Sequence, residues 1–205
     1  MNEPTGIAFD NAGNLYVANY AGGTIEKFTP GGVGSIFANL AFAFGLAFDN
    51  AGNLYAGSLV NNMIEKFTPG GVGSVFANTG LSNPVGLAFD SAGNLYAANA
   101  AGNTIEKFTP GGNGSVFATG LNTPFGLAFD STGNLYAANQ GNNTIEEFTP
   151  GGVGSVFASS GLGSPSFITF DTPEPSTLGM FAIGGVVLLM LRWRTGRMRR
   201  NQGRT

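Results

Sequence analysis

Cysteine and histidine are both absent from this chain of 205 residues, and charged side chains make up only 10% of it. Without cysteine, neither a disulfide bond nor a thiolate metal site can form, and oxidising and reducing compartments are both compatible. Without histidine, catalysis by Ser–His or Cys–His pairs is excluded, and the commonest metal ligand is missing. Any catalytic or metal site within the chain would therefore depend on carboxylates.

Positive charge is also scarce over most of the chain. All six arginines follow Leu191, whereas the twelve acidic residues and the three lysines precede it. The net charge of −3 therefore combines an acidic body with a basic end. An acidic body argues against nucleic-acid binding, which depends on neutralising phosphates with Lys and Arg.

The basic end follows an uncharged apolar run at residues 178–191. At ~1.5 Å per residue this run is short for a hydrocarbon core of about 30 Å, but flanking residues lengthen it. We predict a single transmembrane helix at 176–191, with the basic tail 192–200 in the cytoplasm, because arginines favour that side. A buried core helix or an interfacial helix is the alternative, but an interfacial helix needs a polar face, which this run lacks. The membrane-flanking basic residues are Arg192, Arg194, Arg197, Arg199 and Arg200.

The segment before the apolar run completes an ordered set of features. Pro173, Glu174 and Pro175 come first, then the apolar run, then the arginine cluster. Over residues 172–200 this arrangement resembles the PEP-CTERM sorting signal of Gram-negative bacteria. The resemblance implies recognition by an exosortase, which is a membrane-embedded cysteine transpeptidase, and cleavage near the motif. It also implies an inner-membrane anchor before processing, followed by delivery to the outer surface or an extracellular matrix of the cell envelope.

The body of the chain, residues 4–171, is a repeat array with a period of about 40 residues. The copy that begins at Pro84 reads Pro-x-Gly-Leu-Ala-Phe-Asp-x-x-Gly-Asn-Leu-Tyr-Ala-Ala-Asn and continues with Asn-x-Ile-Glu-Lys-Phe. The copies occupy residues 4–40, 41–83, 84–123 and 124–164, with a partial fifth copy at 165–171.

Each copy contains four short runs of aromatic and aliphatic residues: Gly-Leu-Ala-Phe, Asn-Leu-Tyr-Ala, Thr-Ile-Glu-Lys-Phe and Ser-Val-Phe-Ala in their usual form. Turn residues separate the runs, as in Asp90-Ser91-Ala92-Gly93, which has the type I preference for aspartate first and glycine fourth. Strand spacing near ten residues and a repeat near forty favour a β-propeller with one four-stranded blade per copy. We therefore predict an all-β fold of four blades plus one strand, followed by the C-terminal helix.

The repeated pattern resembles the NHL-type β-propeller family from Pro4 to about Phe170. The resemblance implies the fold but not one function, because relatives include binding modules, sugar-lactone hydrolases and a streptogramin lyase. Members often carry aspartate at three positions where this chain has asparagine. The resemblance therefore gives no support to a metal or acid–base role there. These positions are Asn19, Asn99 and Asn139.

The number of copies favours a piece of a longer protein. Propellers usually have roughly 4–8 blades, and four copies plus one strand fit a four-bladed ring poorly. The sequence also opens on a repeat, without the basic stretch and apolar region of the signal peptide that an exported protein should carry. We therefore expect a fragment of a larger propeller. If the chain is complete, its first and last blades expose strand edges unless a second copy pairs with them.

The carboxylates that recur in every copy are the candidates for a site. The repeated aspartates could point toward a common axis and hold a cation such as calcium; otherwise each closes a turn by bonding nearby backbone N–H groups. Four equivalent copies favour the turn role, since catalysis normally needs groups in different environments, and no cofactor is then expected. The recurring glutamates are interpreted as solvated strand positions, because charged side chains are rarely buried. The aspartates are Asp10, Asp49, Asp90 and Asp130, and the glutamates are Glu26, Glu65, Glu106 and Glu146.

Departures from the repeat mark another candidate region. In the second copy, Phe42 and Phe44 replace the usual lead-in, the pattern at 57–60 is altered, and Met63 replaces threonine. Tyr20 is unique at its position in the first copy. These residues could line a shallow apolar ligand patch, or they could reflect drift in loops of a duplicated array.

Three hypotheses about function follow from these features. The favoured hypothesis is an exported, non-enzymatic propeller that binds exopolysaccharide or another surface ligand, because the repeats are uniform and histidine is absent. The alternative is a lactonase-like hydrolase whose active site lies in blades outside this sequence. A remnant without activity is the third hypothesis.

Overall fold

The computed structural model describes residues 2–170, and in that range every regular element is a β-strand. The strands form four antiparallel sheets, each made of four strands that follow one another in the sequence. The prediction of an all-β fold is thereby confirmed. In chain order the strands are β1 (Pro4–Phe9), β2 (Leu15–Asn19), β3 (Thr24–Phe28), β4 (Gly34–Asn39), β5 (Ala43–Phe48), β6 (Leu54–Ser58), β7 (Met63–Phe67), β8 (Gly73–Ala77), β9 (Pro84–Phe89), β10 (Leu95–Asn99), β11 (Thr104–Phe108), β12 (Gly114–Thr119), β13 (Pro124–Phe129), β14 (Leu135–Asn139), β15 (Thr144–Phe148) and β16 (Gly154–Ala158).

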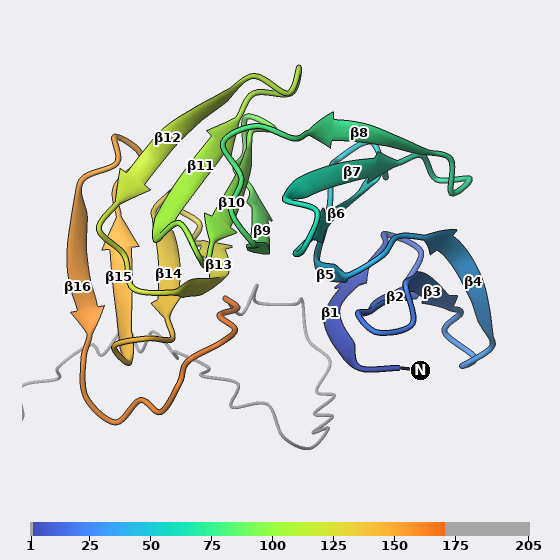
Figure 1. Cartoon of the computed structure of the whole chain (residues 1–205), viewed down its shortest axis with the longest axis horizontal. Helices are drawn as coiled ribbons and strands as arrows, with labels where there is room; N and C mark the ends of the chain where they lie inside the picture. The colour runs from blue at the N-terminus through green and yellow to red at the C-terminus, as the bar shows by residue number, and fades with distance from the viewer. Residues whose placement is uncertain (1, 171–205) are drawn as a thin grey trace, which may run out of the picture.

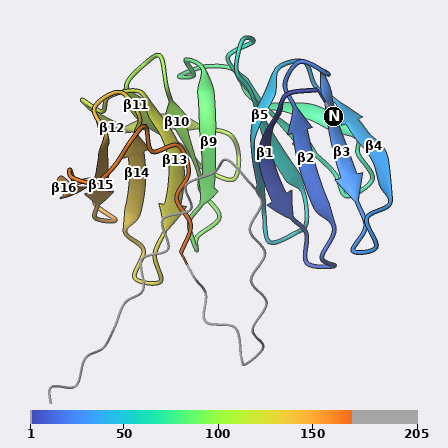
Figure 2. The ribbon, with the colours of Figure 1, turned by 90° about the horizontal axis from the view of Figure 1, so that it is seen from below.

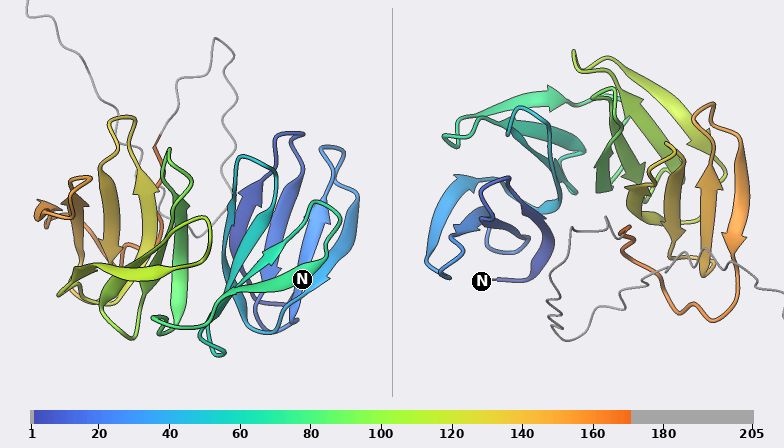
Figure 3. Two further views of the ribbon diagram at one scale, coloured as in Figure 1. Left: turned by 90° about the horizontal axis from the view of Figure 1, so that it is seen from above. Right: turned by 180° about the vertical axis from the view of Figure 1, so that it is seen from behind.

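The four sheets are arranged as the blades of a propeller (Figure 1). The first strand of each blade lies near the centre, and β1 contacts β5, β5 contacts β9, and β9 contacts β13. The fourth strands lie at the outside, and the strands of all blades run between the same two ends of the molecule (Figures 2 and 3). The prediction of a propeller built from four-stranded blades is confirmed.

The hydrophobic cores lie between blades, and successive blades share them. The first core joins Tyr16 and Ile25 of the first blade to Leu46 and Leu54 of the second. Two further cores join the second blade to the third and the third to the fourth. The second strands β6, β10 and β14 are buried along their whole length. This two-sided burial explains why large and small apolar residues do not alternate cleanly with polar ones.

Glycine allows the inner strands to approach one another closely. A Cβ added to Gly6 would collide with the backbone carbonyl of Phe44, and one added to Gly86 would collide with that of Phe125. A Cβ added to Gly45 would collide in the same way with the backbone carbonyl of Val85. Because backbone cannot move aside as a flexible side chain can, glycine in the first run of each full copy is a requirement of the fold.

The partial fifth copy differs from the expected extra strand. Residues 165–170 lie beside β13, where the first strand of a next blade would lie, but they form no strand. An inner strand pairs by backbone hydrogen bonds only with the second strand of its own blade, and within residues 2–170 the fifth copy has no second strand. The predicted helix at 176–191 lies outside the described residues.

Candidate functional site

The repeated aspartates lie in the turns that join the first and second strands of the blades. Asp10 Oδ1 accepts hydrogen bonds from the backbone N–H groups of Ala12 (3.0 Å) and Asn14 (2.8 Å), and Oδ2 accepts one from the Asn14 side chain (2.7 Å). The other three aspartates make the same contacts within their own turns. No group of three or more carboxylates within residues 2–170 could hold a metal ion. The described structure therefore uses these aspartates to close turns and does not gather them at the axis.

Hydrogen bonds lower the pKa of the four turn aspartates, and in three blades the charge of a lysine lowers it further. Burial by itself raises the pKa of Asp90, but hydrogen bonds from Asn94 and Ala92 and the charge of Lys107 bring that pKa below its ordinary value. Lys107 Nζ lies 3.8 Å from Asp90 Oδ2 and 5.2 Å from the centre of the Tyr96 ring. The first two blades repeat this ion pair and this cation–π contact. Sequence reasoning missed the cluster, although Tyr and Lys recur at a fixed spacing in three copies.

The fourth blade changes this cluster. Glu147 takes the place of the lysine, and the Tyr136 hydroxyl donates a hydrogen bond to Glu147 Oε1 at 2.9 Å. Burial raises the pKa of Tyr136, and the hydrogen bond and negative charge of Glu147 raise it further. The negative charge of Asp130 also raises the pKa of Tyr136. One blade therefore places two carboxylates where the others place an ion pair.

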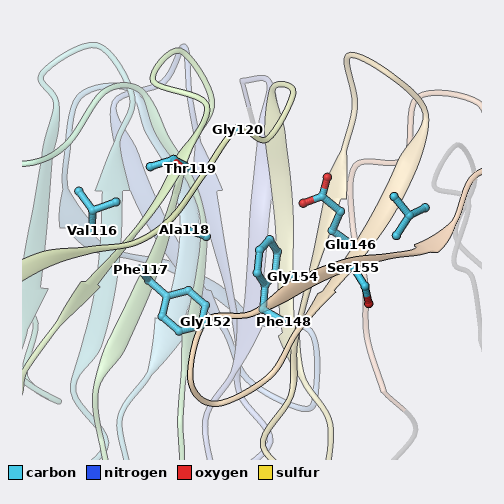
Figure 4. Close-up of a pocket in the computed structure, with 11 residues that line it drawn as sticks. Val116, Phe117, Ala118, Thr119, Gly120, Glu146, Phe148, Gly152, Gly154 and Ser155 are labelled. Atoms are coloured by element: carbon cyan, nitrogen blue, oxygen red, sulfur yellow. The ribbon is translucent and has the colours of Figure 1, made fainter.

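Two of the recurring glutamates, Glu106 and Glu146, lie against the preceding blade or its linker. A groove of about 490 Å³ lies between β12 and the strands β15 and β16, and Phe117, Phe148 and Glu146 line it (Figure 4). In the equivalent place on the third blade, Glu106 is only 5% exposed, and its carboxylate packs against Gly80. Burial raises the pKa of both glutamates.

The interpretation of these glutamates as solvated strand positions is therefore wrong for Glu106. It is incomplete for the half-buried Glu65 and Glu146, whose pKa values burial also raises. The physical reason is the stacking of blades, which places the linker of the preceding blade over the third strand. A single blade considered alone leaves this side chain in water.

Two of the three asparagines that stand where family members often carry aspartate, Asn99 and Asn139, bind the linker before their own blade, whereas the buried Asn19 Oδ1 has no hydrogen-bond partner within residues 2–170. The Asn99 side chain donates a hydrogen bond to the Gly80 carbonyl (2.8 Å) and accepts one from the Ser82 N–H (3.1 Å), which fixes the linker before β9. Ser58 does similar work in the second blade by donating to the Ala41 carbonyl (2.7 Å). Three asparagines at this position are almost fully buried: Asn19, Asn99 and Asn139.

Aromatic residues gather at one end of the propeller axis. The Tyr20 ring lies 5.5 Å from that of Phe42 and 6.4 Å from that of Phe44, and Phe44 lies 5.8 Å from Phe125. Phe44 belongs to the second blade and Phe125 to the fourth, so their contact spans the axis. Phe42 is 37% exposed, and the other three rings are partly buried. We call these four residues the axial aromatic patch.

Several residues that differ from the repeat pattern lie in the axial aromatic patch. Phe42, Phe44 and Tyr20 are all in it, and Leu59 packs in the same cluster as Phe44. The sequence identified these residues as unusual, but it did not indicate that Phe125 of the fourth copy joins them. Phe125 follows a proline in an otherwise regular copy, so only the arrangement of the blades around the axis reveals the contact.

Comparison with known protein families gives a match near the C-terminus of the chain. Residues 171–197 match the PEP-CTERM protein-sorting motif. The chain carries a PEP-CTERM sorting signal. Such a signal implies export and sorting to the cell envelope. The motif at 173–175, the predicted helix and the arginines at 192–200 all lie outside the described residues. Among residues 2–170, no helix is long and apolar enough to cross a membrane.

The propeller is similar to several solved structures. An inactive virginiamycin B lyase from Staphylococcus aureus with quinupristin shares 16% identity at a TM-score of 0.73, covering 82% of this chain and 59% of that chain. A nidogen/laminin complex shares 28% identity at a TM-score of 0.72, covering 80% and 67%. A gluconolactonase from Xanthomonas campestris shares 19% identity at a TM-score of 0.70, covering 80% and 65%. These neighbours are NHL or related β-propeller proteins, in agreement with the resemblance seen in the sequence.

The chain spans less than two thirds of the lyase and gluconolactonase chains, at 59% and 65% of their lengths. No curated protein matches it. The likeness to these enzymes therefore concerns the fold.

Proposed function

We propose that the protein is an exported propeller that acts as a non-enzymatic binding module at the cell surface or in the extracellular matrix. The observation that carries this proposal is the sorting motif at 171–197, which directly follows the propeller. An exosortase-type transpeptidase cleaves near residues 173–175, and the C-terminal helix holds the chain in the inner membrane until then. The blades are released or transferred as one folded unit.

The axial aromatic patch is the proposed ligand site. It combines Tyr20, Phe42, Phe44 and Phe125 from three blades, and Phe42 is open to solvent at 37% exposure. Aromatic rings supply large apolar contact area, and a tyrosine hydroxyl adds a polar group beside it. The apolar faces of sugar rings in an exopolysaccharide fit this combination. Flat polymer ligands also suit an open patch better than an enclosed cavity.

A hydrolase of the lactonase type is the second candidate, because the propeller is similar to gluconolactonases in fold. That function would need an active site formed partly by residues outside this sequence, with calcium as the expected cofactor. The aspartates of the described blades support it poorly, because their oxygens accept hydrogen bonds within their own turns. The binding module remains the better-supported proposal.

The test is binding of the full chain, in detergent, to purified bacterial exopolysaccharides by calorimetry. We expect Phe42→Ala to weaken binding about tenfold, which corresponds to about 1.4 kcal/mol. Val72→Ala is the matched control, since Val72 is also an exposed apolar residue of the second copy and lies in the turn between β7 and β8, outside the axial aromatic patch. Equal loss in both variants would contradict the assignment of the patch. Lactone hydrolysis together with a calcium-dependent rise in melting temperature would favour the second candidate instead.

A further inference from the structure

Every internal junction between blades contains the same group of three aromatic rings. At the first junction, the Tyr16 ring lies edge-on to Phe37 of its own blade (4.9 Å between centroids) and to Phe48 of the next blade (5.0 Å). Tyr55 and Tyr96 form the same group at the other two junctions. The inner strand of each following blade thus supplies one phenylalanine to a tyrosine of the blade before it.

The first strand of the first blade carries Phe9 at the position of these phenylalanines, and Ile7 two residues before it. Nothing within residues 2–170 covers these two side chains. Ile7 and Phe9 are each 63% exposed. We call these two side chains the leading face of β1. The leucines that correspond to Ile7 in the other blades are nearly buried: Leu46 at 8%, Leu87 at 9% and Leu127 at 7% exposure. The leading face therefore has the composition of a blade junction, and no preceding blade covers it among residues 2–170.

The fourth blade presents the other half of such a junction. The Tyr136 ring lies 5.1 Å from Phe157 of its own blade and 4.9 Å from Phe170. Residues 165–170 run along β13, and a Cβ added to Gly126 would lie 2.7 Å from one of their carbonyl oxygens. They form no strand, so one extended segment occupies a place that a complete four-stranded blade fills elsewhere.

A hydrogen bond at the linker end of the blades also recurs. An asparagine Oδ1 in one blade accepts the backbone N–H of the residue that precedes the next inner segment, at 2.7 Å in each case. The pairs are Asn62 with Asn83, Asn103 with Thr123 and Asn143 with Ser164. The three donor residues have positive φ, of 50°, 50° and 48°. Glu3 precedes β1 in the same way and has a φ of 52°, so its backbone is set for the same contact.

We infer that the leading face of β1 docks on the fourth blade of a second copy of this chain, in a head-to-tail contact. Phe9 of one copy takes the place of Phe170 beside Tyr136, and Ile7 takes the place of Ile168. The Glu3 N–H donates to Asn143 Oδ1. The docked β1 belongs to a complete blade, so it covers the face of the fourth blade more fully than residues 165–170 do.

The two copies use different surfaces in this contact, so the assembly is heterologous. Such contacts close into a ring when the rotation between copies permits, and otherwise extend as a chain. Either assembly would repeat the axial aromatic patch along one structure, which would raise the avidity for a polymeric ligand. The docking itself does not depend on the proposed function.

The first test is the molar mass of the full chain in detergent micelles, measured by light scattering with the micelle contribution subtracted. We expect a mass of two or more copies that falls to one copy in the double variant Ile7→Lys/Phe9→Lys. Both side chains are exposed, so the variant should fold. Val33→Lys/Val72→Lys is the matched control, at 70% and 69% exposure in hairpin turns away from β1, and should associate like the parent chain. A parent chain that is monomeric, or association that survives the Ile7 and Phe9 substitutions, would overturn the inference.

A cross-linking experiment separates this contact from association through the C-terminal segment or another surface. The chain has no cysteine, so single cysteines can be introduced without background. A mixture of Glu3→Cys and Asn143→Cys chains should form a mixed dimer with a short bismaleimide reagent. Neither Glu3→Cys alone nor a mixture of Glu3→Cys with Val72→Cys should do so. Equal cross-linking in all three samples, or none in the first, would reject the head-to-tail geometry.

Discussion

Glu106 is a carboxylate that the blade stack buries without a basic partner among the described residues. Burial raises its pKa above the ordinary value of 4.5, because the ionised form loses hydration. The unfolded chain gives up this proton more readily than the folded one. The ionised glutamate therefore lowers the free energy of unfolding at neutral pH, and that loss diminishes as the pH falls through the raised pKa toward 4.5.

We predict that Glu106→Gln raises the melting temperature by a few degrees at pH 7, and that the gain shrinks as the pH is lowered toward 5. Calorimetry at several pH values between 7 and 5 measures this while the turn aspartates stay ionised, since their pKa values lie below 3.8. Glu26→Gln is the control, because the described residues place no preceding blade over Glu26. An equal gain in both variants would show that burial by the linker is not the cause.

The first strand of each blade, which lies nearest the axis, tolerates the least change in side-chain size. These strands contact one another through backbone at a glycine, so no larger side chain fits there without shifting a neighbouring strand. The same glycine is not demanded by the backbone conformation, because it is not among the glycines with positive φ. Its role is close approach, which depends on the neighbouring blade and not on the local turn.

We predict that Gly86→Ala destabilises the propeller by about 2–4 kcal/mol, since the added methyl group collides with the Phe125 carbonyl. Urea unfolding followed by circular dichroism measures the change. Gly111→Ala serves as the control, because a Cβ there meets nothing closer than 3.9 Å. A cost below about 0.5 kcal/mol for Gly86→Ala would mean that the inner strands move apart easily.

The whole molecule joins a folded propeller to a sorting signal at its end. The acidic body of the sequence corresponds to the propeller, and the basic end belongs to the segment that carries the sorting motif. Recognition by a processing enzyme depends on a short sequence motif, whereas the propeller depends on contacts between distant repeats. The two parts should therefore respond independently to mutation.

We predict that replacing Pro173, Glu174 and Pro175 together by alanine leaves the chain unprocessed in the inner membrane of an exosortase-containing host. Immunoblots of membrane, envelope and medium fractions follow the change in size and location. Pro165→Ala, which lies in the partial fifth copy outside the motif, should be processed as usual. Normal release of the triple variant would contradict cleavage directed by this motif.

The sequence alone determined the architecture of this protein, because a period of about 40 residues with four apolar runs admits few folds. It also determined the sorting signal, whose motif, apolar run and arginines follow one another in the chain. Turn aspartates such as Asp10 were predictable as well, since their partners lie within four residues. Local spacing was sufficient for each of these features.

Only the tertiary structure decided which residues from different copies meet. The burial of Glu106 under Gly80, the contact of Phe44 with Phe125 across the axis, and the exposed face at Phe9 all depend on how blades stack. Equivalent residues have similar sequence surroundings, so a repeat pattern cannot distinguish a covered blade face from an open one. Packing between successive blades gives equivalent side chains different environments, and those differences define the candidate site and the docking surface.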